Sequence, residues 1–188
     1  SRGLGDVYKR QGYMYFRYFM WNFSGKQDDI QGKMDLHGNW ISGINFIDEI
    51  ILGISQKNLP SDVLNNKGRN TYFLLPFLLG LLGCYFLYNV NKEYFWVFLT
   101  LFIFTGLAIQ VYTNVRPFEP RERDYSLVGS FYVFCIFIGL GGYCISKIFT
   151  SLKIWFAQIL SFLICFFAVP VNLFANNYDC LLYTSPSP

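Results

Sequence analysis

The charged sequence NVRPFEPRERDY, residues 114–125, lies between two long apolar runs. This alternation of apolar and charged segments decides the fold. Pro117 and Pro120 each remove a backbone N–H and fix φ, so the segment cannot form a continuous helix. The flanking runs, residues 94–112 and 126–145, contain no Asp, Glu, Lys or Arg. We therefore expect an ion-rich hairpin connection between two membrane helices. Its ionisable residues are Arg116, Glu119, Arg121, Glu122, Arg123 and Asp124.

Two further uncharged runs, residues 72–90 and 154–173, complete the predicted membrane region. Each run has close to the ~20 residues that cross ~30 Å of hydrocarbon as a helix. Backbone polar groups in lipid must be paired within their own segment, so these runs are helices. The sequence thus predicts an all-α, polytopic transmembrane bundle with about four spanning helices in residues 71–179. Pro170 is expected to bend or end the fourth helix.

Small residues in these runs predict where the helices touch. Glycines allow two helix backbones to approach closely in a membrane. The connection at residues 91–93 is very short, so the first two helices should be antiparallel neighbours. The glycines concerned are Gly80 and Gly83 in the first run and Gly139, Gly141 and Gly142 in the third.

The composition agrees with a membrane protein. Hydrophobic residues make up 53% and aromatic residues 21% of the chain, while charged residues make up only 14%. Soluble domains carry about 25% charged residues. The formal net charge is +3, which is too small to indicate a nucleic-acid partner. Membrane lipid is the expected partner.

The two ends of the chain read as translated adaptor sequence. Residues 1–11 back-translate to a common transposase sequencing adaptor, and residues 180–188 translate its reverse complement, shifted by one base. We expect neither end to be native, as with a fusion scar. Residues 12–179 are then expected to be an internal part of a longer protein, whose missing parts are partners of this region. Without the first end, the net charge becomes +1.

Residues 12–70 are expected to hold an aromatic helix and a polar or interfacial loop region. Residues 12–25 carry one charge, Arg17, which would either extend to the membrane interface or pair inside the bundle. Residues 40–54 could lie at the membrane surface or pack as a short amphipathic helix. Residues 59–62 read as a turn followed by a helix.

The charged connection has two interpretations. Arg116, Arg121 and Arg123 offer forked donors that match a phosphate, so the segment could bind an anionic lipid headgroup. The acids Glu119, Glu122 and Asp124 could orient these arginines, or could simply pair with them in a structural salt-bridge network. Arg17 is a secondary candidate.

Other chemistry-bearing residues point to structural roles. His37 is expected to be a hydrogen-bonded loop histidine, and the acidic pair at residues 28–29 is expected to be solvated. The four cysteines of residues 12–179 occur singly in apolar runs, as small apolar residues do. The sequence predicts no metal site and no cofactor.

Several phrases resemble one bacterial membrane family: YMYFRYFMWNFSGKQDDIQG, GNWISGI, NNKGRN and RPFEPRERDYSLVGSFY. This is the domain of unknown function 2723 family, which is similar to protein O-mannosyltransferases and is classed as glycosyltransferase family 117. The resemblance covers essentially all of residues 12–179. It implies an inner-membrane protein of the lipid-dependent glycosyltransferase superfamily.

The resemblance implies transfer of a sugar from a polyprenyl-phosphate donor to a protein or envelope acceptor. The catalytic acid of that superfamily lies in an early loop, which would precede this region, so no catalytic residue is expected here and this region alone should be inactive. A transporter or envelope-assembly protein, with the charged connection as a hinge, is the alternative. The positive-inside rule puts the arginine-rich side in the cytoplasm, whereas the resemblance puts it outside.

Overall fold

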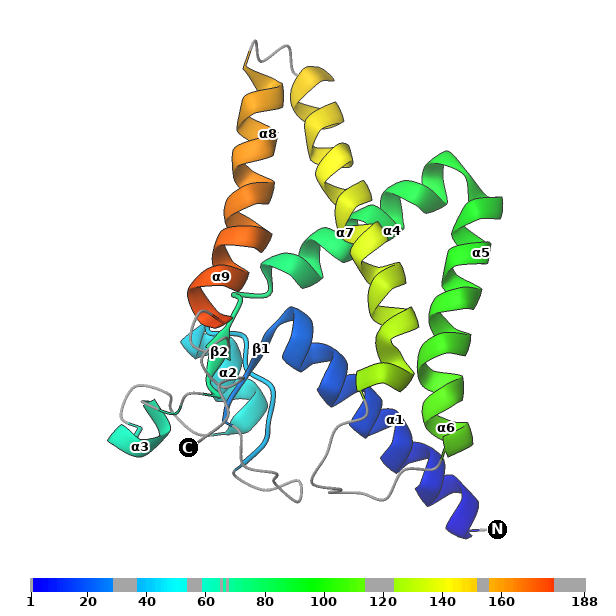
Figure 1. Ribbon diagram of the computed structural model, residues 1–188, viewed down its shortest axis with the longest axis vertical. Coiled ribbons are helices and arrows are strands. Elements are labelled where there is room, and N and C mark those ends of the chain that lie inside the picture. The colour runs from blue at the N-terminus through cyan, green and yellow to red at the C-terminus, as the bar shows by residue number, and fades with distance from the viewer. Residues whose placement is uncertain are drawn as a thin grey trace, which may run out of the picture.

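The computed structural model describes residues 2–28, 37–53, 59–64, 66, 68–113, 124–151 and 156–177. Within them the chain is all-α, as predicted, apart from one two-stranded antiparallel sheet (Figure 1). The N-terminal elements are α1 (Arg2–Phe23), β1 (Gly25–Lys26), α2 (Asn45–Leu52), α3 (Ser61–Leu64) and β2 (Asn70–Thr71).

The membrane region follows these elements, and two of its helices contain a π-helical turn. It consists of α4 (Leu75–Val90), α5 (Lys92–Ile103), η1 (Phe104–Ala108), α6 (Ile109–Thr113), α7 (Asp124–Ser151), α8 (Ala157–Phe166), η2 (Phe167–Val171) and α9 (Asn172–Asn177).

Three of the described helices are long and apolar enough to cross a membrane. They are Lys92–Thr113, Ser126–Ser151 and Ala157–Asn176, and they confirm the second, third and fourth predicted spans. Pro170 does not end the last of these helices. The chain widens into the π-helical turn η2 around the missing N–H and continues as α9.

The first predicted span is shorter than expected. Helix α4 has only 16 residues, about 24 Å at 1.5 Å per residue. The preceding residues cannot join it, because Thr71 belongs to β2 and Phe73 and Leu74 have positive φ angles of 53° and 58°. Figure 1 shows α4 running obliquely behind α7. It is an apolar helix that packs across the bundle.

Glycines mark the crossing of α4 and α7. The sequence predicted close helix contacts at these glycines but did not pair these two helices. A Cβ at Gly83 would collide with the Phe137 carbonyl oxygen, and one at Gly141 with the Leu79 carbonyl oxygen. A Cβ at Gly80 would enter the ring of Phe134, which belongs to the buried core. The prediction fails for Gly139, where an added Cβ would have no atom within 4 Å.

A small layer of extended backbone, here called the β layer (residues 24–27, 39–43 and 70–72), lies at one end of the bundle (Figure 1). Strands β1 and β2 pair Gly25 with Thr71, and Ile41 N–H donates to the Gly25 carbonyl at 3.1 Å. Gly25 has no room for a side chain, because an added Cβ would lie 2.5 Å from the Asn70 carbonyl oxygen and 2.8 Å from that of Ile41.

The last helix holds the β layer in place through an asparagine amide. Asn176 Oδ1 accepts from Thr71 N–H at 3.1 Å, and Asn176 Nδ2 donates to the Thr71 carbonyl at 2.9 Å. This pair of bonds repeats the pattern of a neighbouring β-strand. Asn172, one turn earlier, donates to the Tyr72 carbonyl at 3.0 Å. The free edge of β2 is thus paired with the end of a spanning helix.

Candidate functional site

Most of the predicted charged site lies outside the described residues. The residues concerned are Arg116, Glu119, Arg121, Glu122 and Arg123. Asp124 is the first residue of α7, where only its backbone is described. Figure 1 shows that α6 ends and α7 begins at the same end of the bundle. The proposal that these residues bind a phosphate therefore remains a prediction.

Arg17 is buried inside the protein, with 3% of its surface exposed. The side chain is therefore packed against other residues of the protein and is not free on its surface. Its guanidinium lies over the ring of Trp21, with Cζ at 4.8 Å from the ring centroid. Lys26 Nζ lies 4.5 Å from the same centroid, so one indole contacts two cations. Cation–π contacts of this kind contribute about 0.5–2 kcal/mol. The cluster joins the end of α1 to β1.

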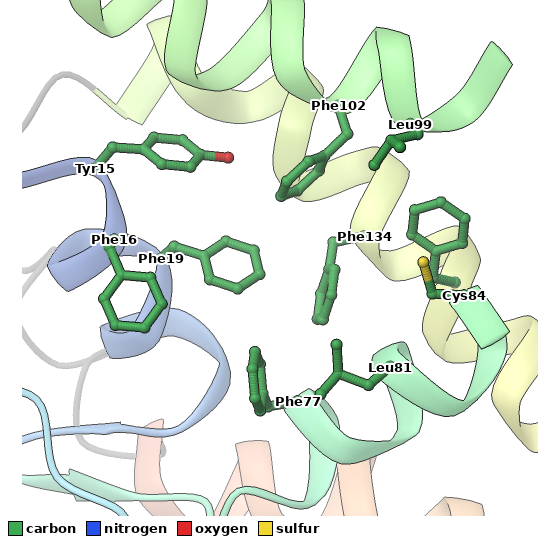
Figure 2. A pocket seen from close by; sticks show the side chains of 10 residues that line it. Tyr15, Phe16, Phe19, Phe77, Leu81, Cys84, Leu99, Phe102 and Phe134 are labelled. Carbon is green, nitrogen blue, oxygen red and sulfur yellow. The ribbon is translucent and has the colours of Figure 1, made fainter. Parts of the chain in front are cut away.

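The opposite side of α1 lines a cavity of about 290 Å³. Residues advance about 100° per position along a helix, so Tyr15, Phe16 and Phe19 share a face that points away from Arg17. We call this space the aromatic cavity. Figure 2 shows side chains from α1, α4, α5 and α7 around it. The lining residues are Tyr15, Phe16, Phe19, Phe77, Leu81, Cys84, Leu99, Phe102, Phe134 and Phe137.

Ring contacts hold the wall of the aromatic cavity together. Phe19 packs edge-on against Phe134, with ring centroids 4.8 Å apart, and against Phe102 at 5.7 Å. Phe77 stacks on Phe134 at 6.2 Å. Such edge-to-face pairs contribute about 0.5–1.5 kcal/mol beyond their buried area. The wall exposes only apolar atoms, so the cavity offers nothing to bind water.

The aromatic cavity lies near the middle of two predicted spans. Phe102 is midway along Lys92–Thr113, and Phe134 and Phe137 are close to the middle of Ser126–Ser151. Two lining residues remain partly exposed, Phe16 at 48% and Leu81 at 47%, and mark an open side. At this depth the surroundings of a membrane protein are hydrocarbon chains, so the opening faces lipid chains.

A buried carboxylate organises the loop that carries the lone histidine. Asp28 Oδ1 accepts from Gly38 N–H at 2.9 Å, and Oδ2 lies 3.0 Å from His37 Nδ1. This confirms the prediction that His37 is a hydrogen-bonded loop histidine. The expectation that Asp28 is solvated is wrong, because it is only 2% exposed. A carboxylate accepting such bonds can be buried because its charge is compensated. The described residues hold no group of three side chains suited to a metal.

Sequence reasoning missed the aromatic cavity because it searched for ionisable groups. The cavity wall comes from four helices, and its lining residues run from Tyr15 to Phe137, so no local spacing reveals it. The available signal was the phenylalanine content, 21 of 188 residues.

Comparisons with protein-family models, with curated proteins and with solved structures find no match to this chain. The function is therefore argued from the site and from the sequence.

Proposed function

We propose that this region belongs to a membrane glycosyltransferase that binds a polyprenyl-phosphate-linked sugar, and that the aromatic cavity holds part of the donor's isoprenoid chain. The observation that carries the proposal is the aromatic cavity itself: it is wholly apolar, lies at mid-span depth and is open on one side. At about 290 Å³ it is near the lower end of ligand sites, so it fits a chain segment rather than a whole lipid.

The chemistry of the cavity wall favours a chain with a fixed shape. A hydrocarbon chain that moves from the bilayer into the cavity gains little transfer free energy, since lipid tails are as apolar as Leu. What remains is dispersion, which depends on close contact. Rigid rings such as Phe19, Phe102 and Phe134 make such contacts with a methyl-branched isoprenoid chain. This contribution positions the chain but cannot select the donor alone.

The protein would select the donor by binding its phosphate group. Arg121 and Arg123 are the proposed phosphate ligands, with Arg116 nearby in the sequence and the acids Glu122 and Asp124 orienting them. Hydrogen bonds to charged groups contribute about 1.5–3 kcal/mol each, which is enough for tenfold discrimination. The acceptor would be a protein or another envelope component, and the bacterial inner membrane is the proposed location.

A photoactivatable isoprenoid phosphate tests the cavity assignment. Reconstituted protein should be labelled on α1, α4, α5 or α7, and Cys84→Phe should reduce the labelling because its ring fills the cavity. Cys135→Phe is the matched control, because Cys135 is exposed on α7 and does not line the cavity. Equal labelling of both variants would remove the cavity from the proposal.

Sugar transfer by the full-length protein tests the enzymatic part. Arg121→Ala should lower transfer from a radiolabelled lipid-linked sugar by tenfold or more, while membrane insertion is unchanged. Unchanged transfer by the inserted variant would exclude Arg121 as a phosphate ligand. Absence of any transfer by the unmodified full-length protein would instead favour the alternative, a transporter or envelope-assembly protein.

A further inference from the structure

Helix α2 carries its apolar side chains on the outside of the protein. Phe46 is 72% exposed and Ile50, one turn later, is 69% exposed. Residues four apart lie on the same helix face. Ile44 and Ile51 extend this face and are about 40% exposed. Leaving such side chains in water forgoes about 1.5–3 kcal/mol each. The face is therefore suited to an apolar environment.

The carboxylate of Asp48 on α2 is turned inward and fully engaged. Asp48 is 2% exposed and accepts from Ser42 N–H at 2.6 Å, Ser42 Oγ at 2.8 Å and Gly43 N–H at 3.0 Å. These bonds fix the rotation of α2 about its own axis. Burying Asp48 necessarily turns Phe46 and Ile50 away from the β layer.

Hydrogen bonds, together with strand pairing, connect α2 to the end of a membrane span. Asp48 holds Ser42, which follows Ile41, and Ile41 N–H donates to the carbonyl of Gly25. Gly25 pairs with Thr71, and Thr71 is bonded in both directions to Asn176. Asn176 is the last residue of the candidate span Ala157–Asn176. The β layer and α2 are therefore held at the end of this apolar helix.

Exposed apolar surface is also present on the span at this end. Leu173 and Phe174, one turn before the end of the span, are 52% and 63% exposed. Figure 1 shows α2 at the same end of the bundle as α9. Both the span and α2 thus expose apolar side chains at the same end of the bundle.

From this geometry we infer that α2 is an interfacial helix whose Phe46, Ile50 and Ile51 side chains insert into the headgroup region of the lipid bilayer. Helices of this kind bury their apolar face about 5–10 Å into the boundary between headgroups and acyl chains. Inserted in this way, α2 anchors one edge of the β layer to the membrane surface, and Asn176 holds the opposite edge of the layer. The inference depends on membrane embedding and is independent of the proposed sugar transfer.

Fluorescence quenching in reconstituted bilayers tests the inference. Phe46→Trp and Ile50→Trp, each measured against the unmodified protein, should have their added emission quenched most strongly when lipids carry bromine near the headgroup. Bromine deep in the acyl chains should quench less. Leu101→Trp is the matched control, because Leu101 is 46% exposed within a span and should show the reverse order.

Two results would overturn the inference. Quenching of both variants by aqueous iodide, with no effect of brominated lipid, would place α2 in water. Protection from iodide and from both brominated lipids would show that protein covers this face, either a second copy or another part of a longer chain. Using two positions on α2 keeps the test valid if one variant fails to fold.

Discussion

Gly83 of α4 and Gly141 of α7 face each other at the point where the two helices cross. A Cβ at Gly83 would lie 2.7 Å from Gly141 N, and one at Gly141 would lie 3.3 Å from Gly83 N. Both positions are also blocked by a carbonyl oxygen of the opposite helix. The two backbones are therefore in direct contact, and the bundle is built outward from this contact.

Substitution of either glycine with alanine should separate α4 from α7. Gly83→Ala and Gly141→Ala should each destabilise the protein by about 1–3 kcal/mol, as overpacked sites do. Gly139→Ala is the control, because Gly139 is on α7 with no atom within 4 Å of an added Cβ, and it should be neutral or stabilising. Thermal unfolding in detergent measures the difference. Equal midpoints for Gly141→Ala and Gly139→Ala would contradict the crossing.

Loss of the Asn176 amide should release the edge of β2. Asn176→Ala leaves the N–H and carbonyl of Thr71 without these bonds, at a cost of about 1–3 kcal/mol for a partly buried group. Hydrogen exchange at the Thr71 amide should accelerate by a factor of ten or more. Asn89→Ala is the control, because Asn89 is exposed and its amide donates to Tyr85 in its own helix. It should leave exchange at Thr71 unchanged.

Replacement of Asp48 should loosen the start of α2. Asp48→Asn turns one acceptor oxygen into a donor that faces the N–H groups of Ser42 and Gly43. We expect a loss of about 1–3 kcal/mol and faster hydrogen exchange across α2. Asn45→Ala, at an exposed position of the same helix, should change neither quantity. Normal exchange in Asp48→Asn would show that the carboxylate does not hold α2.

Removal of the Trp21 ring should weaken the junction between α1 and the β layer. Trp21→Leu removes the ring that contacts both Arg17 and Lys26, and each contact contributes about 0.5–2 kcal/mol. Trp96→Leu is the control, because Trp96 is 57% exposed and packs on Phe95 within the same helix. Chemical unfolding in detergent should separate the variants. A control that is equally destabilised would contradict the role of Trp21.

The sequence was sufficient to predict the helical class, three spans and close helix contacts at three glycines, but not which helices cross there. Each depends on a local property: uncharged length for the spans, and the missing Cβ for Gly80, Gly83 and Gly141. The predicted start of α4 was wrong because Tyr72 is apolar, and hydropathy cannot show that its N–H donates to the Ser24 carbonyl. Pairing between distant segments overrode the local pattern.

The candidate site was less predictable for the same reason. Arg17 and Asp28 are both buried, and the charge of a side chain alone does not show whether the fold covers it. Helix α1 also runs without a break across residues 11 and 12, the expected end of the adaptor sequence. The adaptor origin of residues 1–11 and 180–188 stays a prediction, and residues 180–188 lie outside the described residues.

The bonds between Thr71 and Asn176 also impose an order on biosynthesis. The two residues are separated by 105 positions, and a ribosome needs roughly 5–20 s to add that many amino acids. During this interval, the outer edge of strand β2 has been translated while its partner has not. The β layer can reach its final form only after the last span has emerged from the ribosome and entered the membrane.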